Sequence, residues 1–146
     1  HARHDARAKL YSYRIWNGAA RSPLRAARSH WLAPALDLAA MRAAARDFCG
    51  RRDFASLQAA GSDVENTVRT LSRLELAGKS RGEIEIRVEG DGFLRHMVRN
   101  LVGTLLEVGS GRRSIDSMTE LLACGDRRKA GPTAPATGLT LVRVFY

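Results

Sequence analysis

Two arginines, a histidine and an asparagine form the densest cluster of chemically active side chains in the sequence. Arg95, His96, Arg99 and Asn100 stand together beside a strongly apolar repeat. An i, i+4 spacing places two side chains on the same side of a helix. This pair of arginines falls in the amino-terminal half of the expected helix, where the macrodipole favours anions. The placement predicts an external anion or a carboxylate partner; the alternative is a solvated basic face.

A second cluster is aromatic. Tyr11 and Tyr13 share one face of a stretch that alternates like a strand, and Arg14 and Trp16 share the other. Aromatic side chains on a sheet can stack on an unpaired base. Packing within the sheet, with each hydroxyl hydrogen-bonded, is the alternative interpretation.

The sequence indicates no metal site and no cofactor. Cys49 and Cys124 stand alone, and the only close histidine pair is His1 and His4, so the spacing of a zinc site is missing. The glycine-containing stretch 131–138 (GPTAPATG) lacks the Lys-Ser/Thr that follows a P-loop. Two isolated cysteines fit a reducing cytoplasm.

The charge of the chain favours a polyanionic partner. Lys and Arg number 24 against 15 Asp and Glu, a net charge of +9 over 146 residues. A gene of high GC content could explain the preference for arginine over lysine, but it does not explain why basic residues crowd into residues 1–30. Such a basic arm suits nucleic-acid phosphates. The residues expected to bind RNA are Arg3, Arg7, Arg14 and Arg25.

Hydrophobic periodicity predicts the elements that position these residues. Strands are expected at 10–17, 67–76, 83–89 and 139–145. Helices are expected at 37–49, 92–108 and 114–123. Loops are expected at 18–35 and 53–65, and no apolar run is long enough to span a membrane. The order predicts one α+β domain, an antiparallel sheet with helices packed on one face.

Several stretches carry a resemblance to a known family. HARHDARAKLYSYRIWN at 1–17 is similar to a family stretch that runs HARF-A, a basic residue, then Y-Y-I-N. GFLRHMVRNLVGTLLEVGSG at 92–111 closely resembles the family's FL-HMVRN-VG-L-EVG helix. Further matches are LDLAAMRAAARDFCGRRDF, ENTVRTL and DRRKAGPTAPATGLTLVRVFY. Over its whole length, the sequence resembles the carboxy-terminal half of tRNA pseudouridine synthases of the TruA type.

The resemblance implies an activity and roles for particular residues. Such enzymes are cytoplasmic homodimers that isomerise uridine to pseudouridine in the anticodon stem-loop of tRNA, without cofactor or metal, on a base flipped out of the stack. Arg99 matches the arginine that pairs with the catalytic aspartate, and Tyr11 matches the tyrosine that stacks on the flipped base. Leu139 matches an apolar wall of the base pocket. Arg95 and His96 are expected to contact the substrate.

The sequence also departs from the family pattern. The family's nucleophilic aspartate sits in an RTD-GVH motif that normally precedes the matched region, and this chain contains no RTD. Arg52 and Leu57 stand where a His or Asn and an aromatic are usual. We therefore expect 1–146 to be a single carboxy-terminal domain, inactive without an amino-terminal domain that carries the aspartate. The alternatives are a stand-alone RNA-binding module without activity and a basic scaffold protein in which Arg99 is merely solvated.

Overall fold

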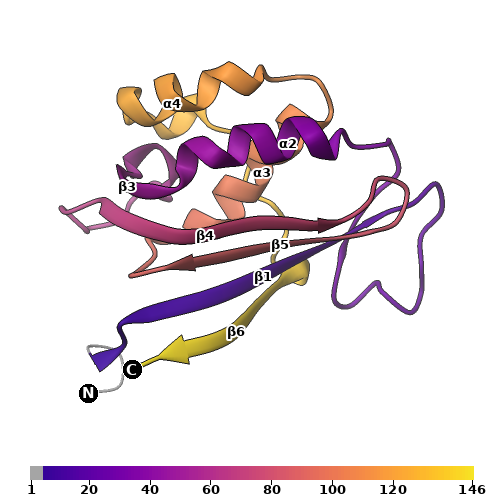
Figure 1. Cartoon of the computed structure of the whole chain (residues 1–146), viewed down its shortest axis with the longest axis horizontal. Helices are drawn as coiled ribbons and strands as arrows, with labels where there is room; N and C mark the ends of the chain where they lie inside the picture. The colour runs from indigo at the N-terminus through magenta and orange to yellow at the C-terminus, as the bar shows by residue number, and fades with distance from the viewer. Residues whose placement is uncertain (1–4) are drawn as a thin grey trace.

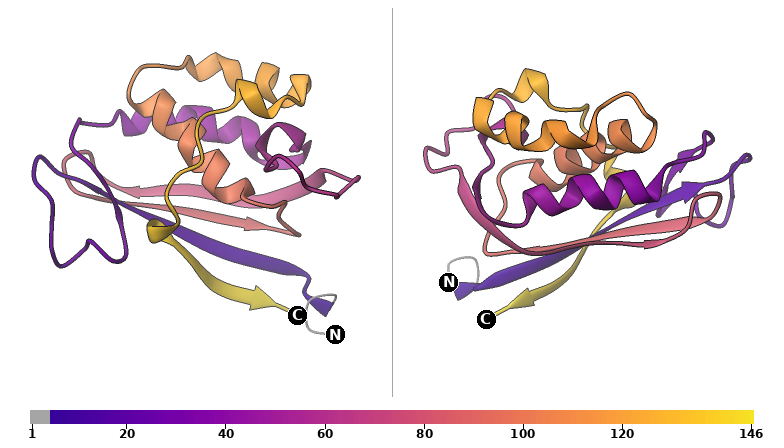
Figure 2. Two further views of the ribbon diagram at one scale, coloured as in Figure 1. Left: turned by 180° about the vertical axis from the view of Figure 1, so that it is seen from behind. Right: turned by 45° about the horizontal axis from the view of Figure 1, so that its top comes forward.

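A layer of helices covers one face of a six-stranded sheet in the computed structural model, which describes residues 5–146. The strands are β1 (Ala8–Asn17), β2 (His30–Leu32), β3 (Gly50–Asp53), β4 (Val68–Gly78), β5 (Glu83–Gly90) and β6 (Leu139–Phe145). The helices are α2 (Leu38–Ala45), α3 (Met97–Gly109) and α4 (Met118–Cys124). Figure 1 and Figure 2 show all three helices on the same side of the sheet, which confirms the predicted α+β class.

The strands run in the order β2-β1-β5-β4-β3, and β6 pairs with β1. All of these pairs are antiparallel except β1 with β2, so the sheet is mixed rather than wholly antiparallel. The parallel strand β2 lies inside 18–35, which the sequence predicted to be a loop. A three-residue strand is too short to show the alternation that identifies strands.

The core fills the space between α2, α3 and the sheet. Alternate residues of β5, among them Ile84, Ile86 and Val88, point into it, because successive strand side chains face opposite sides. From the other layer, Leu101 and Leu105 of α3 are fully buried. Truncating such a leucine to alanine costs about 2–5 kcal/mol of stability, since the lost contacts leave a cavity.

The start of α3 differs from the sequence-based expectation. The helix was predicted over 92–108, but it begins at Met97, because His96 has a left-handed backbone with φ of 57°. A residue in that conformation cannot continue a right-handed helix. Arg95 therefore lies before the helix, and the predicted pairing of Arg95 with Arg99 on one helical side is wrong. Asn100, the fourth member of the polar cluster, is fully buried and does not share a solvated face with the arginines.

The other helix ends follow ordinary capping chemistry. The Oδ1 atom of Asp37 accepts a hydrogen bond from the backbone N–H of Ala40 at 3.0 Å and caps α2. The Ser114 side chain accepts from the backbone N–H of Asp116 and caps a short 3₁₀ turn, Ile115–Ser117, that leads into α4. Within residues 5–146, no helix combines the length and apolar character needed to cross a bilayer.

Candidate active site

A hollow of about 180 Å³ at the amino-terminal end of α3 brings together four of the predicted site residues. Tyr11 enters from β1, Leu139 from β6, and His96 and Arg99 from the start of α3. The remaining lining residues are Phe93, Leu94, Met97, Val98 and Ala136. Arg95 is exposed and does not line the hollow.

Sheet register explains why the tyrosine and the leucine meet. Leu139 pairs with Tyr13 across β1 and β6, and Leu141 pairs with Tyr11. Residues two apart on a strand share a face, so Tyr11, Tyr13 and Leu139 all point to the side that the helices cover. The Tyr11 ring meets Phe93 edge-on, with centroids 5.1 Å apart and planes at 88°. This contact holds the half-exposed tyrosine against one wall of the hollow.

Two hydrogen bonds to the backbone of Ala134 position Arg99 and leave the terminal N–H groups of its guanidinium available to a ligand. Its Nε donates to the carbonyl oxygen of Ala134 at 2.7 Å, and the Ala134 N–H donates back to the Arg99 carbonyl at 3.1 Å. Within residues 5–146, its terminal nitrogens make no hydrogen bond and no carboxylate pairs with it. The site therefore holds a fixed, half-buried positive charge without a counter-ion, a suitable partner for a carboxylate or phosphate.

The loop that holds Arg99 is docked on α3 through a buried amide. The Asn100 Nδ2 donates to the Leu57 carbonyl at 2.8 Å. The Asn100 Oδ1 accepts from Thr133 Oγ1 at 2.6 Å and from an Arg127 terminal nitrogen at 3.0 Å. Because the Asn100 amide is fully buried, it depends on these partners for its hydrogen bonds. The network fixes the segment that presents Ala134 to Arg99.

A glycine in the middle of α3 lets the same loop approach closely. A Cβ atom placed on Gly103 would lie 1.6 Å from the carbonyl oxygen of Pro132. No side chain larger than hydrogen fits there unless the loop moves away. Gly103 therefore determines how closely the loop that contains Pro132 and Ala134 approaches α3.

Tyr13 anchors the turn that forms another wall of the hollow. Its hydroxyl donates to the Pro135 carbonyl at 2.5 Å, and its ring lies 2.7 Å from where a Cβ of Gly138 would be. Burial raises the pKa of Tyr13 to about 12, although the Arg99 charge acts in the opposite direction. Tyr13 is thus a neutral packing residue with a satisfied hydroxyl, and only Tyr11 opens into the hollow.

His96 lies at the edge of the hollow and has a left-handed backbone and a lowered pKa. Desolvation, followed by the charges of Arg99 and Arg95, holds the pKa of His96 below its usual value. The imidazole is therefore neutral at pH 7. A left-handed backbone at a non-glycine residue is uncommon and clusters at functional sites.

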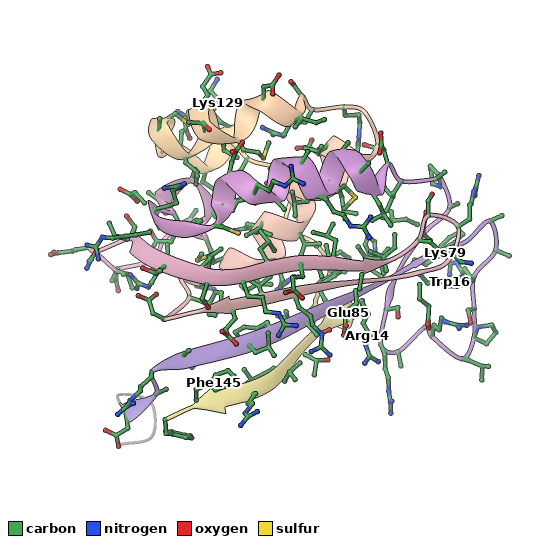
Figure 3. The ribbon with its side chains drawn as sticks, viewed as in Figure 1. Arg14, Trp16, Lys79, Glu85, Lys129 and Phe145 are labelled. Atoms are coloured by element: carbon green, nitrogen blue, oxygen red, sulfur yellow. The ribbon has the colours of Figure 1, made fainter. Side chains whose placement is uncertain are left out.

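Three of the four residues predicted to bind RNA fall within the described part of the chain, and they lie outside the hollow around Arg99. Arg3 falls outside the described residues, and Arg7 is exposed ahead of β1. Arg14 points from β1 toward Glu85 on the open face of the sheet, at 3.8 Å (Figure 3). Arg25 lies in the loop after β1, where it stacks on Trp16. Arg7, Arg14 and Arg25 do not line that hollow.

Sequence reasoning missed several residues that build the hollow. Phe93 and Met97 line the hollow, and the buried Asn100 amide docks the neighbouring loop, although local periodicity assigns no such roles to them. A glycine in the middle of a strongly helical pattern, Gly103, was the available signal for a close backbone approach. Among the described residues, no group of three or more His, Cys, Asp or Glu side chains is arranged to hold a metal ion.

Comparison with known proteins identifies relatives over the whole chain. The chain is 48% identical over 143 residues to a tRNA pseudouridine synthase A of Myxococcus xanthus, covering 97% of this chain and 53% of the relative. It is 46% identical over 147 residues to the protein of that name from Geobacillus kaustophilus, covering 100% of this chain and 56% of the relative. The chain thus spans little more than half the length of these curated relatives.

A family model provides the second comparison. The model described as tRNA pseudouridine synthase matches residues 44–146, which include α3, the docked loop and β6. All residues that line the hollow fall in this matched region except Tyr11, which lies in the part of the chain that the Geobacillus relative also covers. The chain therefore belongs to the tRNA pseudouridine synthase family.

Proposed function

We propose that this chain is the carboxy-terminal domain of an isomerase that converts uridine to pseudouridine in the anticodon stem-loop of tRNA. The observation that carries the proposal is Arg99, a guanidinium fixed by Ala134 in a hollow shared with Tyr11 and paired with no carboxylate of residues 5–146. The similarity to tRNA pseudouridine synthase A of two bacteria supports this class of reaction.

In this proposal, Arg99 pairs with an aspartate that polypeptide outside this chain supplies. A guanidinium next to a carboxylate lowers the carboxyl pKa and fixes its direction, which keeps the nucleophile ionised. The reaction breaks the nitrogen–carbon glycosidic bond, turns the base and forms a carbon–carbon bond. The proton leaves the newly bonded base carbon, and the freed ring nitrogen gains one. Atoms balance without any co-reactant, so no cofactor or metal is needed.

Tyr11 and Leu139 serve the flipped base in this scheme. The Tyr11 ring provides a flat apolar surface, and Leu139 closes the side of the pocket formed by β6. Base–aromatic stacking contributes about 1–3 kcal/mol per base, comparable with the expense of taking a nucleotide out of its stack. His96 and Arg95 would contact the substrate from the rim, His96 as a neutral hydrogen-bonding group.

The outer edge of β6 is where we place the domain that carries the aspartate. Within residues 5–146, β6 pairs only with β1, and the side chains of Leu141 and Val142 are 48% and 45% exposed. An apolar strand with an open edge favours pairing with another strand. Because Leu139 begins β6, a domain added along this edge would lie next to the hollow. The complete enzyme would act in the cytoplasm as a homodimer, with basic residues of β1 and the following loop on tRNA phosphates.

A chimera tests the proposed function. The part of the Myxococcus xanthus relative that precedes its matched region is fused to this chain, and pseudouridine is measured in an unmodified tRNA transcript. We expect the chimera to form pseudouridine and this chain alone to form none. A folded chimera that binds tRNA without forming pseudouridine would contradict the proposal and leave an RNA-binding module. Formation by this chain alone would contradict the role assigned to the missing aspartate.

A further inference from the structure

A second hollow, of about 280 Å³, lies on the other side of the turn that closes the candidate active site. We propose that this hollow binds a further unpaired nucleotide of the RNA, by stacking of its base and pairing of its phosphate with arginine. We call it the Trp–Arg pocket. The residues that line it include Trp16, Arg21, Arg25, Trp31, Pro135 and Thr137. The inference rests on the proposed function, because it assumes an RNA substrate.

Strand register sets the two indoles side by side. β1 and β2 are parallel, and Trp16 of β1 is the register partner of Trp31 of β2. Partners on adjacent strands point to the same face, so both rings lie on one side of the sheet. Figure 3 shows Trp16 at the end of β1 from which the loop 18–29 extends.

The loop fixes the orientation of both rings. The Trp16 Nε1–H donates to the Ala20 carbonyl at 2.9 Å, and the Trp31 Nε1–H donates to the Gly18 carbonyl at 2.9 Å. With their only polar groups satisfied by backbone, the indoles are held as preformed stacking surfaces rather than mobile side chains. A ring already ordered loses little conformational entropy when a base stacks on it.

Each indole carries an arginine. The Arg25 guanidinium carbon lies 4.5 Å from the Trp16 ring centroid, and that of Arg21 lies 4.8 Å from the Trp31 centroid. RNA bases stack on guanidinium planes as well as on aromatic rings, and the same groups bind phosphate through their N–H donors. The pocket thus combines both kinds of contact that an unpaired nucleotide needs.

The charge of the pocket is not fully compensated. Arg25 pairs with Glu83 at 2.5 Å, but Arg21 forms no ion pair within residues 5–146. The sequence from 18 to 36 contains no Asp or Glu. A phosphate of the RNA would give Arg21 the counter-ion that residues 5–146 do not supply.

The turn Ala136–Gly138 connects the Trp–Arg pocket to the candidate active site. Ala136 and Leu139 line the hollow around Arg99, whereas Pro135 and Thr137 line the Trp–Arg pocket. Tyr13 holds this turn through the Pro135 carbonyl. A strand of RNA with one base in the active-site hollow can therefore cross a single turn and place a neighbouring nucleotide on the indoles.

The chain provides its own probe for this proposal. Trp16 and Trp31 are its only two tryptophans, so intrinsic tryptophan fluorescence reports on the Trp–Arg pocket alone. The chain is titrated with a short unstructured oligoribonucleotide, and binding is followed by anisotropy of a label on the RNA. A ribose-phosphate oligomer of the same length without bases serves as the second ligand. We expect the RNA to quench tryptophan emission at saturation, and the abasic oligomer to bind more weakly without that quench.

Two charge-matched variants distinguish binding at the Trp–Arg pocket from nonspecific attraction of RNA to a basic protein. Arg21→Gln should weaken binding about threefold or more, because it removes the uncompensated charge beside the stacking site. Arg128→Gln removes the same charge at a side chain that is 90% exposed and paired with Asp126, and it should bind like the parent. RNA binding without any change in tryptophan emission, or equal weakening by both variants, would overturn the pocket. In that case, pseudouridine formation by the chimera would still support the proposed function.

Discussion

Arg99 and Ala134 exchange two hydrogen bonds, from the guanidinium Nε to the Ala134 carbonyl at 2.7 Å and from the Ala134 N–H to the Arg99 carbonyl at 3.1 Å. Both ends of the arginine are thereby tied to one loop residue. The direction of the remaining N–H donors thus depends on how the loop is docked, and not only on α3. Changes that move the loop should disturb the site without touching Arg99 itself.

Gly103→Ala is the first such change. The added methyl group would meet the Pro132 carbonyl oxygen at 1.6 Å, so the loop must shift. We expect a loss of about 1–3 kcal/mol in the free energy of unfolding, typical of overpacking, measured by urea denaturation. Gly82→Ala is the control, because its methyl group meets only Lys79, at 3.4 Å. Equal stability of the two variants would show that the loop is not packed against the helix as described.

Tyr13→Phe tests the anchor of the turn. The variant loses the hydrogen bond to the Pro135 carbonyl and should be about 1 kcal/mol less stable at pH 7. A tyrosine whose pKa is raised to about 12 in the folded state stabilises the protein fully below pH 10, the unfolded value. That contribution falls by about 1.4 kcal/mol per pH unit as pH rises from 10 to 12, so the parent should lose its advantage over the variant within this range. Denaturation curves that stay parallel over this range would contradict a buried Tyr13 hydroxyl.

His96 should titrate below the ordinary range of histidine. Desolvation is the largest cause, and the charges of Arg99 and Arg95 add to it. Arg99→Gln should therefore raise the pKa of His96 in part, as measured from its imidazole resonances by NMR. Arg112→Gln, an exposed arginine that does not line this hollow, is the charge-matched control and should leave the titration unchanged. The same pKa of His96 in the parent and in Arg99→Gln would contradict an electrostatic effect of Arg99 on His96.

Binding of tRNA to the isolated chain should be weak and should depend steeply on salt. Each phosphate neutralised by an arginine releases counter-ions, which adds about 0.7–0.9 to the slope of log affinity against log salt. Arg25→Gln should reduce that slope, whereas Arg128→Gln should not. Affinity that is independent of salt would contradict an electrostatic contact between the basic loop and RNA.

The sequence predicted the sheet and helix layers of this fold well, because the elements of each layer are identified by local hydrophobic periodicity. The alternation at 83–89 and the apolar repeat of the long helix placed β5 and most of α3 correctly. The start of α3 could not be predicted in this way, since His96 is not a glycine and its residue type gives no sign of a left-handed backbone. The strand β2 was missed because its pairing with Trp16 is decided by tertiary contact.

The candidate site was predictable only in part, because some of its residues are brought together by contacts that leave no local pattern in the sequence. Motif resemblance singled out Arg99, Tyr11 and Leu139, and the structure places all three at one hollow. The docking network of Asn100 joins residues far apart in the sequence, so no local pattern reveals it. The Trp–Arg pocket likewise depends on strand register and loop hydrogen bonds rather than on residue spacing.

The most direct measurement concerns Arg99→Ala in the chimera described above. Single-turnover pseudouridine formation at saturating tRNA and the equilibrium affinity for tRNA are measured for the parent and the variant. If Arg99 positions the nucleophilic carboxylate, the rate should fall by orders of magnitude while affinity changes little. Comparable losses in rate and affinity would show that Arg99 is a phosphate contact, and would contradict its assignment as the partner of the catalytic aspartate.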